Sequence, residues 1–290
     1  MQLDNMNTPE HYVSNIQNLT NLWRAMGAKA LGPETEPALQ ASESWPDRLW
    51  FGVHAQLERP DALRLIEVAR TAARPMLLPV WSRDEPDGSS SPQTAMAWSL
   101  ARELDAAGFE VSFEQTLMAM SLASWNPSAV AGIEVELQEV EHDTSDWADV
   151  ASRSFGYTVP TAVTDKLIED TGVSLMIARK AGQPVGTGLV YAHGETAGLH
   201  MVGVLPEARR KGIARKIMLR LLDDARARGF PLATLQASPM GEGLYRELGF
   251  EPQGRILNRA APTGERKCAQ HLGQQAAAAL ETCDGSAGKA

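Results

Sequence analysis

The 290-residue sequence predicts an α/β (α+β) fold in which helices flank a sheet, and two kinds of pattern carry this prediction. Residues 133–140 alternate apolar and polar side chains, the period of a half-buried strand. Residues 212–229 place their apolar side chains on one helical stripe, which ends at Gly229. From residue 133 onward the predicted order is β-α-α-β-β-β-α-β-α-β, an α/β arrangement around a sheet.

Glycine and proline positions divide the first half into elements. Pro9 suits a first helical turn, while Gly27 and Gly108 suit helix ends. Segments 31–47 and 82–93 are rich in turn-forming residues and are expected to be loops. The elements expected between them are helices at 9–27, 61–73 and 94–108, and strands at 48–55, 75–81 and 110–123.

The second half has stronger signals. Two short helical segments begin with helix-start residues and end at glycines. Two further glycines divide a long β-rich stretch into three strands. The elements expected here are strands at 133–140, 232–238 and 250–260, three strands within 173–204, and helices at 143–156, 161–172, 212–229 and 241–249.

The length favours two domains, because one domain usually spans about 100–200 residues. Proline and glycine in 124–132 indicate the boundary between them. We therefore expect an N-terminal domain at 1–130 and a second domain at 131–262. The remaining residues, 263–290, are expected to form a frayed tail with one Ala-rich helix at 267–281.

Composition excludes several classes of protein. A net charge of −9 argues against general nucleic-acid binding, which needs a basic footprint. No run of 18 apolar residues predicts a membrane span, and the polar first residues lack a signal core, so we expect a cytoplasmic protein. Two cysteines, Cys268 and Cys283, are too few for a disulfide framework or a cysteine-based zinc site, and we expect no metal.

A local excess of positive charge stands out against this acidic background. Residues 205–230 carry eight basic and three acidic side chains. Three consecutive basic residues precede Gly212, where a predicted strand and turn open onto a helix. The first N–H groups of a helix lack partners and its dipole is positive there, so this turn suits phosphate oxygens. No G-x-x-x-x-G-K-(S/T) pattern is present, which excludes a P-loop nucleotide site.

The spacing Arg209-x-x-Gly212-x-Ala214 resembles the pyrophosphate loop of the GNAT family of N-acyltransferases. The segment SPMGEGLYRELGF at 238–250 resembles the second signature of that family, and the resemblance covers about 133–260. It implies a mixed, mostly antiparallel sheet flanked by helices, together with acetyl-CoA as acyl donor. It also implies that the primary amine of an acceptor attacks the thioester directly.

The same resemblance implies the donor-binding residues. The backbone of the strand end would pair with the pantetheine arm, the amides of the glycine loop would hold the pyrophosphate, and the basic side chains would add positive charge. Many family members carry asparagine where this chain has a serine before the last helix. The implied residues are Val202, Gly203, Val204, Arg209, Arg210, Lys211, Gly212, Ile213, Ala214, Arg215 and Ser238.

Two residues are candidates for proton transfer. Tyr245 matches the family tyrosine that protonates the leaving thiolate, and the alternative interpretation is a packed aromatic ring with a satisfied hydroxyl. The strand glutamate that serves as base in part of the family is replaced here by Gly198. His200, two residues further on the same strand face, is a candidate base, and a water relay to a distant carboxylate is equally open.

The first half resembles an inactive copy of the second. Residues 48–123 repeat the strand and helix order of 197–260, and ARELDAAGFE at 101–110 echoes YRELGFE at 245–251. The corresponding loop, 56–61, lacks glycine and the basic run, and Ala101 stands at the tyrosine position. Such a copy would pack on the active half and shape the acceptor site. Five of the seven tryptophans lie before residue 100, either as core residues or as the lining of an acceptor groove.

These patterns leave the acceptor unidentified beyond a small-molecule or peptide amine. No nucleic-acid or membrane partner is expected, and a homodimer stays open. The alternative function is an acyl-CoA-binding sensor or interaction module without turnover, which the missing glutamate and Ser238 keep open.

Overall fold

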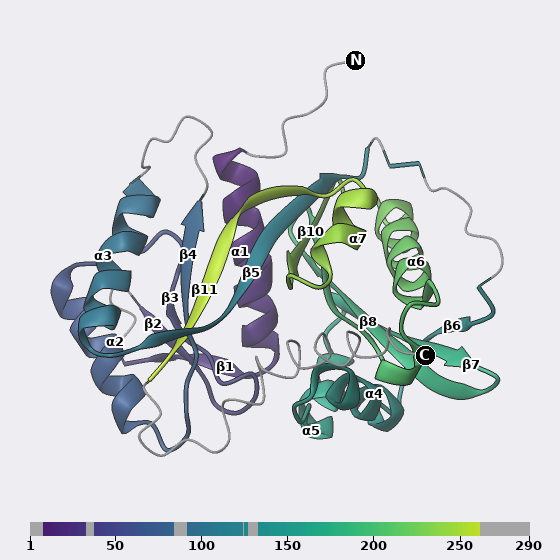
Figure 1. Cartoon of the computed structure of the whole chain (residues 1–290), viewed down its shortest axis with the longest axis horizontal. Helices are drawn as coiled ribbons and strands as arrows, with labels where there is room; N and C mark the ends of the chain where they lie inside the picture. Colours follow the sequence, from purple (N-terminus) through teal and green to yellow (C-terminus); the bar gives the residue numbers. More distant parts are fainter. Residues whose placement is uncertain (1–7, 33–37, 84–91, 124, 127–132, 262–290) are drawn as a thin grey trace, which may run out of the picture.

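A computed structural model describes residues 8–32, 38–83, 92–123, 125–126 and 133–261 (Figure 1). The expected tail at 263–290, its helix and both cysteines lie outside the described residues. None of the helices within these ranges combines the length and the apolar character that crossing a membrane requires.

The elements follow the predicted order closely, with one short 3₁₀ helix, η1, at Pro206–Ala208. The helices are α1 (Pro9–Ala25), α2 (Arg59–Thr71), α3 (Pro92–Ala106), α4 (Ser145–Phe155), α5 (Thr161–Leu167), α6 (Ile213–Ala227) and α7 (Glu242–Glu247). The strands are β1 (Ala28–Leu31), β2 (Leu39–Ser42), β3 (Leu49–Phe51), β4 (Leu78–Arg83), β5 (Glu110–Ser121), β6 (Glu136–Glu139), β7 (Val173–Lys180), β8 (Gln183–His193), β9 (Thr196–Val204), β10 (Leu232–Ala237) and β11 (Glu251–Ala260).

One sheet joins both halves of the chain. Its eight strands lie in the order β4-β11-β5-β10-β9-β8-β7-β6. All neighbours in it pair antiparallel except β9 and β10, which pair parallel. The prediction of a mixed, mostly antiparallel sheet flanked by helices is therefore confirmed.

The two halves exchange strands at the centre of this sheet. Strand β11 of the second half lies between β4 and β5 of the first, and β5 lies between β11 and β10. The succession β3-α2-β4-α3-β5 matches β9-α6-β10-α7-β11 element for element. A parallel bridge between Arg48 and Leu77 joins the entrances of β3 and β4, as the parallel pair joins β9 and β10. The topology thus has the two-copy order that the sequence suggested.

The prediction of a loop over 31–47 was wrong. Strand β2 and the last residue of β1 lie within its described part; the two strands pair antiparallel, and β2 pairs with β3 in a small separate sheet. Each has only four residues and carries polar side chains such as Lys29 and Gln40, so neither shows the alternation that marks a longer strand.

Two cores lie on opposite faces of the large sheet. Helix α6 covers one face, where Ile217, Met218 and Leu222 are fully buried among strand residues. Helices α1 and α4 cover the other face, where Ile16, Leu22 and Trp147 are buried. In Figure 1, α1 lies at the middle of the molecule behind β5 and β11. The N-terminal helix therefore packs where the two halves meet.

Candidate active site

Strands β9 and β10 pair over only three residues and then separate. Their parallel register runs from Thr196–Leu232 to Gly198–Thr234 and stops there, although both strands continue. A gap in main-chain pairing therefore opens in the middle of the sheet, toward the carboxyl ends of both strands. Ligands of α/β folds commonly bind where neighbouring strands part in this way.

A β-bulge bends β9 away at this point. Leu189 pairs with His200 and Thr187 pairs with Gly203, so Met201 and Val202 together oppose the single residue between them on β8. Met201 has a positive φ of 51°, and its carbonyl accepts a hydrogen bond of 2.9 Å from the Thr187 hydroxyl. Bulges of this kind re-aim a strand beside active sites, and left-handed strain at a non-glycine residue marks a functional position.

The turn from β9 into α6 has the backbone of an anion site. Arg210 and Gly212 both have positive φ, at 61° and 77°, and Gly212 is the N-cap of α6. The backbone at 210–212 is exposed, and the first N–H groups of α6 point into it without intrahelical partners. Left-handed residues next to a helix N-terminus form concave sets of amides that bind phosphate.

Gly212 is required at this turn for two reasons. Its φ lies in the left-handed region, and a Cβ added there would lie 2.5 Å from Cδ1 of Ile133. A side chain would therefore strain the backbone and push against the segment before β6.

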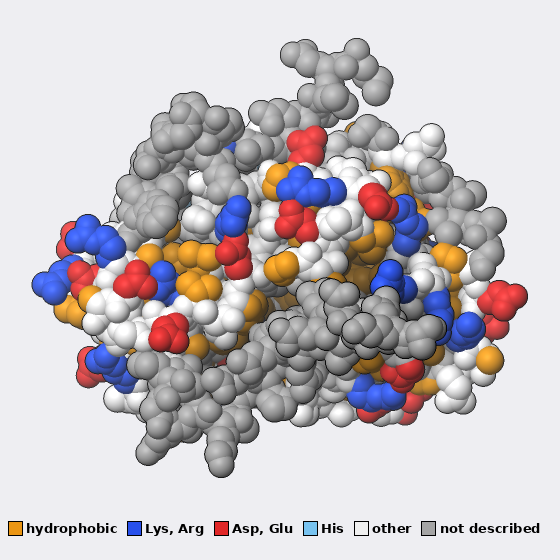
Figure 2. All heavy atoms as spheres, viewed as in Figure 1, with side chains coloured by type: hydrophobic (Ala, Val, Ile, Leu, Met, Phe, Trp, Pro, Cys, Tyr) orange, Lys and Arg blue, Asp and Glu red, His pale blue; other side chains and the backbone are white. Residues whose placement is uncertain are grey.

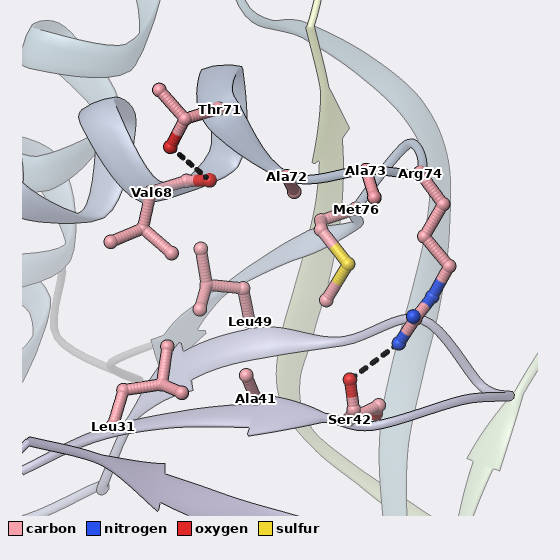
Figure 3. Close-up of a pocket in the computed structure, with 10 residues that line it drawn as sticks. All are labelled: Leu31, Ala41, Ser42, Leu49, Val68, Thr71, Ala72, Ala73, Arg74 and Met76. Carbon is pink, nitrogen blue, oxygen red and sulfur yellow. Dashed lines mark hydrogen bonds between the residues drawn. The ribbon is translucent and has the colours of Figure 1, made fainter.

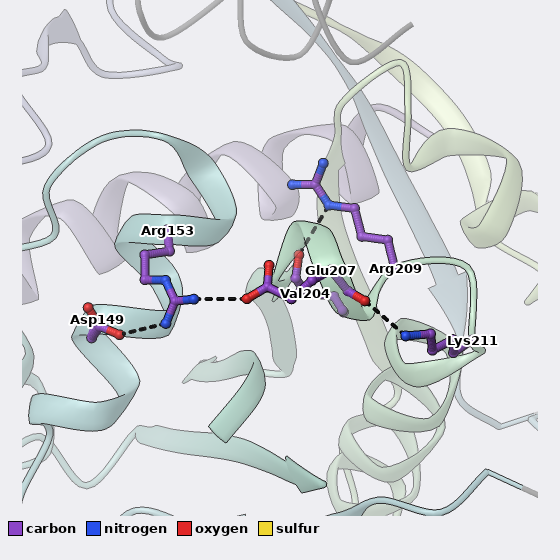
Figure 4. A network of polar contacts seen from close by, with 6 residues as sticks. All are labelled: Asp149, Arg153, Val204, Glu207, Arg209 and Lys211. Atoms are coloured by element: carbon purple, nitrogen blue, oxygen red, sulfur yellow. Dashed lines mark hydrogen bonds and ion pairs between the residues drawn. The ribbon is translucent and has the colours of Figure 1, made fainter. Parts of the chain in front are cut away.

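Basic side chains surround the turn and are held by the chain itself (Figure 4). Arg209 donates from Nε to the Val204 carbonyl at 3.2 Å and from Nη2 to the Ser154 carbonyl at 2.9 Å. Lys211 donates to the Glu207 carbonyl at 2.9 Å, and Arg215 pairs with Glu247 of α7. Figure 2 shows Lys and Arg side chains gathered on the part of the surface that α6 occupies. The turn is thus ringed by fixed positive charge.

Tyr245 and Ser238 stand on the far side of the gap. Tyr245 of α7 lies edge-on to Phe250, with ring centroids 6.2 Å apart, and burial raises the pKa of its hydroxyl to about 12. Tyr245 and Val202 both pack against the core under α6. The Ser238 side chain is exposed, and its carbonyl accepts from Gly241 and Glu242 at the start of α7.

His200 lies at the floor of the gap, with 7% of its surface exposed. Its Nε2 lies 2.9 Å from Oδ1 of Asn18, and its Nδ1 lies 3.1 Å from Oε1 of Gln236. Burial lowers the pKa of His200 to about 4, and the hydrogen bond to Gln236 acts in the opposite direction. With this pKa the imidazole is neutral at pH 7, so it has one N–H and can donate to only one of the two amide oxygens, and its role as base stays a prediction.

Backbone groups fix the amide orientations around His200. Asn18 donates from Nδ2 to the carbonyls of Tyr191 and Thr196, so its oxygen faces the imidazole. Asn15 donates to the Met118 carbonyl and accepts from Nε2 of Gln236 at 2.8 Å. Asn15 and Asn18 are both fully buried on α1. This polar network ties α1 to β9 and β10 where these strands part.

Gly198 now has a structural explanation. A Cβ built at Gly198 would lie 1.8 Å from Oδ1 of Asn18 and 2.4 Å from Nε2 of His200. Helix α1 thus fills the space that a side chain at the glutamate position would need. The base function implied for that position has no room here because the N-terminal helix occupies it.

The equivalent turn in the first half is closed to anions. Helix α2 begins at Arg59, and the Asp61 carboxylate accepts from the Glu58 N–H at 2.8 Å. Pro60 lacks an N–H, and both acidic side chains place negative charge where a diphosphate would bind. The Glu58 and Asp61 carboxylates and the missing N–H of Pro60 support the inference that the first half cannot bind pyrophosphate.

The cavity drawn in Figure 3 lies elsewhere. It has a volume of about 230 Å³ and is lined by residues of β2, β3 and the end of α2, among them Leu49, Val68 and Met76. Arg74 at its edge donates to the Ser42 carbonyl at 2.5 Å and pairs with Asp47. This cavity belongs to the first half and is not part of the gap between β9 and β10.

Comparison with known proteins agrees with the geometry. Residues 140–250 match the model of the acetyltransferase (GNAT) family. No curated protein sequence matches the chain. Among solved structures, the chain is similar to a GCN5-related N-acetyltransferase from Kribbella flavida, with 19% identity and a TM-score of 0.62 over 89% of this chain and 97% of that one.

Two further structures cover most of the chain. A tandem GNAT protein from the clavulanic acid biosynthesis pathway shares 14% identity, with a TM-score of 0.56 over 92% of this chain and 98% of that one. An acetyltransferase described as of the GNAT family, from Novosphingobium aromaticivorans, shares 15% identity and has a TM-score of 0.54, over 86% and 97%. At these identities the likeness shows the fold.

The parted parallel strand pair, the bulge and the basic glycine turn all lie within or beside the segment that matches the acetyltransferase family model. Residues 140–250, a part of the second half, are similar to the GNAT family model. Acyl transfer is accordingly the class of reaction that the domain supports.

Sequence reasoning missed Asn15, Asn18 and Gln236. The first two interrupt the apolar stripe of α1 at a spacing of three residues, which was a readable signal of a buried polar contact. Gln236 lies in a strand that otherwise reads as fully buried, and nothing local shows its partner.

We expect Gly198→Ala to destabilise the protein by about 2–3 kcal/mol, because the added methyl group collides with the Asn18 amide. Chemical denaturation of Gly198→Ala, Asn18→Ala and the double variant measures this. The double variant should lose less stability than the two single variants lose together, since removal of the Asn18 amide makes room for the added methyl group. Additive losses would contradict the packing described here.

The lowered pKa of His200 predicts acid sensitivity. The unfolded chain takes up a proton near pH 6.5, whereas the folded protein resists it until about pH 4, so the free energy of unfolding falls as the pH drops between these values. The loss reaches about 3 kcal/mol at full protonation. Denaturation of the protein and of His200→Gln from pH 7 to pH 4.5 should show a steeper fall for the unmodified protein. Parallel curves would disprove the shift.

Proposed function

We propose that this protein is an N-acetyltransferase that moves the acetyl group of acetyl-CoA to a primary amine. The observation that carries the proposal is the anion-binding turn at 209–214 directly beside the point where β9 and β10 part. One end of the donor would lie on the turn, and its thioester would lie in the gap. No other cofactor is needed for the chemistry.

The reaction forms a C–N bond and breaks a C–S bond. The amine nitrogen attacks the thioester carbonyl, the developing oxyanion collapses, and the thiolate leaves. The amine loses one proton and the thiolate takes one, so the proton count balances. The protein has to orient the two reactants and stabilise the oxyanion, and both tasks depend on a rigid site.

The donor-binding roles follow the resemblance residue by residue. Exposed amides of Arg210, Lys211 and Gly212, with those of Ile213 and Ala214, would bind the diphosphate. Val202, Gly203 and Val204 would offer main-chain groups to the pantetheine arm, with the Val204 carbonyl shared with Arg209. Arg209, Lys211 and Arg215 would supply charge, and the exposed Ser238 would contact the donor beyond the gap.

Tyr245 is proposed as the acid that protonates the leaving thiolate. With a pKa of about 12 its hydroxyl keeps the proton at neutral pH. Its ring is held by Phe250, so the hydroxyl has a defined position.

The base is proposed to be a water relay rather than His200. Both imidazole nitrogens contact amide oxygens of the network, and burial lowers the basicity of the ring. His200 would then have a structural role, because its contacts with Asn18 and Gln236 connect α1, β9 and β10 at the gap. A relay leads the amine proton to solvent or to a distant carboxylate.

The first half is proposed to be an inactive copy that completes the site of the second. We place the functional unit for donor binding at 131–262 and the copy at 1–130, with the two sharing the large sheet through β5 and β11. The acidic start of α2 supports loss of donor binding in the copy.

The second candidate function is an acyl-CoA sensor that does not turn over. The replacement of the family glutamate by Gly198, with its space filled by Asn18, favours this alternative. Both functions use the donor site. They differ in whether the protein transfers the acetyl group, with Tyr245 contributing to the rate of transfer.

We expect coenzyme A to bind the protein in calorimetry and Gly212→Ala to weaken that binding by about tenfold or more, because the turn amides shift. Gly229→Ala is the matched control, since Gly229 follows the other end of α6 with a φ of 85° and open space around it. Its affinity should equal that of the unmodified protein. Absence of coenzyme A binding by the unmodified protein would remove the proposal.

Tyr245→Phe should lower kcat by about a hundredfold while leaving coenzyme A affinity unchanged, because only the proton donor is lost. A thiol-release assay with acetyl-CoA and a panel of amines measures the rate. Tyr191→Phe, which removes a hydroxyl on β8, is the control and should keep full activity. A protein that binds coenzyme A and releases no thiol with any amine would be a sensor.

A further inference from the structure

Arg48, a partly buried arginine of the first half, lacks side-chain hydrogen bonds at two of its nitrogens among the described residues. Arg48 directly precedes β3 in the β2–β3 hairpin, and its backbone exchanges hydrogen bonds with Ser42, at 3.0 Å to the Ser42 hydroxyl and 2.8 Å from the Ser42 N–H. Among the described residues, Nε and Nη1 of Arg48 are buried without a hydrogen-bond partner. Burying an unpaired cation is costly, so such a group needs a reason.

The neighbouring acid, Asp47, attracts the Arg48 charge but forms no hydrogen bond with Nε or Nη1. Asp47 pairs with Arg74, which also donates to the Ser42 carbonyl. Arg48 instead lies against two aromatic rings, with its Cζ 5.6 Å from the centroids of both Trp23 and Phe113. Burial lowers its pKa to about 10, so the guanidinium is still charged at pH 7. The guanidinium is thus held between the two rings with two buried nitrogens that form no hydrogen bond.

The position of Arg48 follows from strand register. Strand β5 pairs with β10 as far as Thr116 and Ala237, and Phe113 lies three residues further, past the carboxyl end of β10. That is the end toward which the gap opens. Arg48, over the Phe113 ring, therefore lies near the mouth of the gap, on the side of the sheet that α1 covers.

Contacts of β9, the strand on the other side of the gap, also extend to the hairpin that carries Arg48. A Cβ built at Gly203, near the end of β9, would lie 3.0 Å from the Phe155 ring. Phe155 stacks on Tyr157 with centroids 5.8 Å apart, and Tyr157 lies 6.2 Å from Trp45 of the hairpin that carries Arg48. The Arg48 charge acts on the Tyr157 hydroxyl, whose pKa burial raises to about 12. A series of aromatic contacts thus extends from Gly203 on β9 to Trp45, in the hairpin that carries Arg48.

We propose that Arg48 binds a carboxylate of the acceptor, so that the substrate is an amino acid or a similar amine that also carries an acid group. The Tyr157 hydroxyl adds a second donor, and the partly buried rings of Trp45, Phe113 and Phe155 contact the apolar part of the substrate. This proposal rests on the proposed acetyl transfer. It makes the first half a supplier of substrate specificity.

The test compares amino acids with their primary amides in the thiol-release assay. The quantity measured is the ratio of kcat/KM for the acid to kcat/KM for the amide, in the protein and in Arg48→Gln. Any difference in amine reactivity cancels between the two proteins. Arg48→Gln should reduce the ratio by about tenfold or more, since a charge-assisted pair is lost. Arg228→Gln, which removes another arginine lying over an aromatic ring, should leave it unchanged.

A binding experiment keeps the two proposals separable. With coenzyme A present, calorimetry should detect binding of N-acetylphenylalanine and no binding of N-acetylphenylalaninamide. Arg48→Gln should bind the two compounds equally weakly. Binding of the acid without any acetyl transfer would refute the proposed function and support the carboxylate site. Transfer with an acid-to-amide ratio that Arg48→Gln leaves unchanged would refute the carboxylate site alone. No binding of the acid form also refutes it.

Misfolding of Arg48→Gln would be seen as a lowered Tm. Arg48→Lys, which keeps the charge, and Tyr157→Phe, which removes only the second donor, then decide the question. Both should retain the fold and lower the acid-to-amide ratio by less than Arg48→Gln does. A ratio equal to that of the unmodified protein in both variants would count against the site.

Discussion

The early end of the parallel pairing between β9 and β10 is the constraint on which the rest of the site depends. Parallel strands normally continue to pair, and leaving main-chain groups open in a sheet is costly. Three devices hold these strands apart: the bulge at Met201, the hydroxyl of Thr187 that fixes it, and the amides of α1 that bind between the strands. The gap is therefore built into the fold before any ligand is bound.

Helix α1 gives the N-terminal residues a direct part in this arrangement. Asn18 satisfies two backbone carbonyls at the edge of the gap and at the same time takes the space beside Gly198. One side chain thus explains both the stable separation of the strands and the missing glutamate.

Most of the second half was readable from the sequence because its signals are local: alternating strands, a striped helix and terminal glycines. The glycine turn and Tyr245 were found for the same reason, since their meaning lies in short spacings. Strands β1 and β2 are too short and too polar to show a period. The partners of His200 lie more than 180 residues away on α1 and 36 residues away on β10, so only the fold brings them together.

The exchange of β5 and β11 has a consequence for how the chain reaches its native state. The place between β4 and β5 is filled by β11, which ends at Ala260, so the first half cannot close its own sheet while it emerges from the ribosome. Its strand edges must wait for β11, and contacts of such long sequence separation form slowly. The two halves consequently mature as one unit, and neither is removable without exposing the edge of the other.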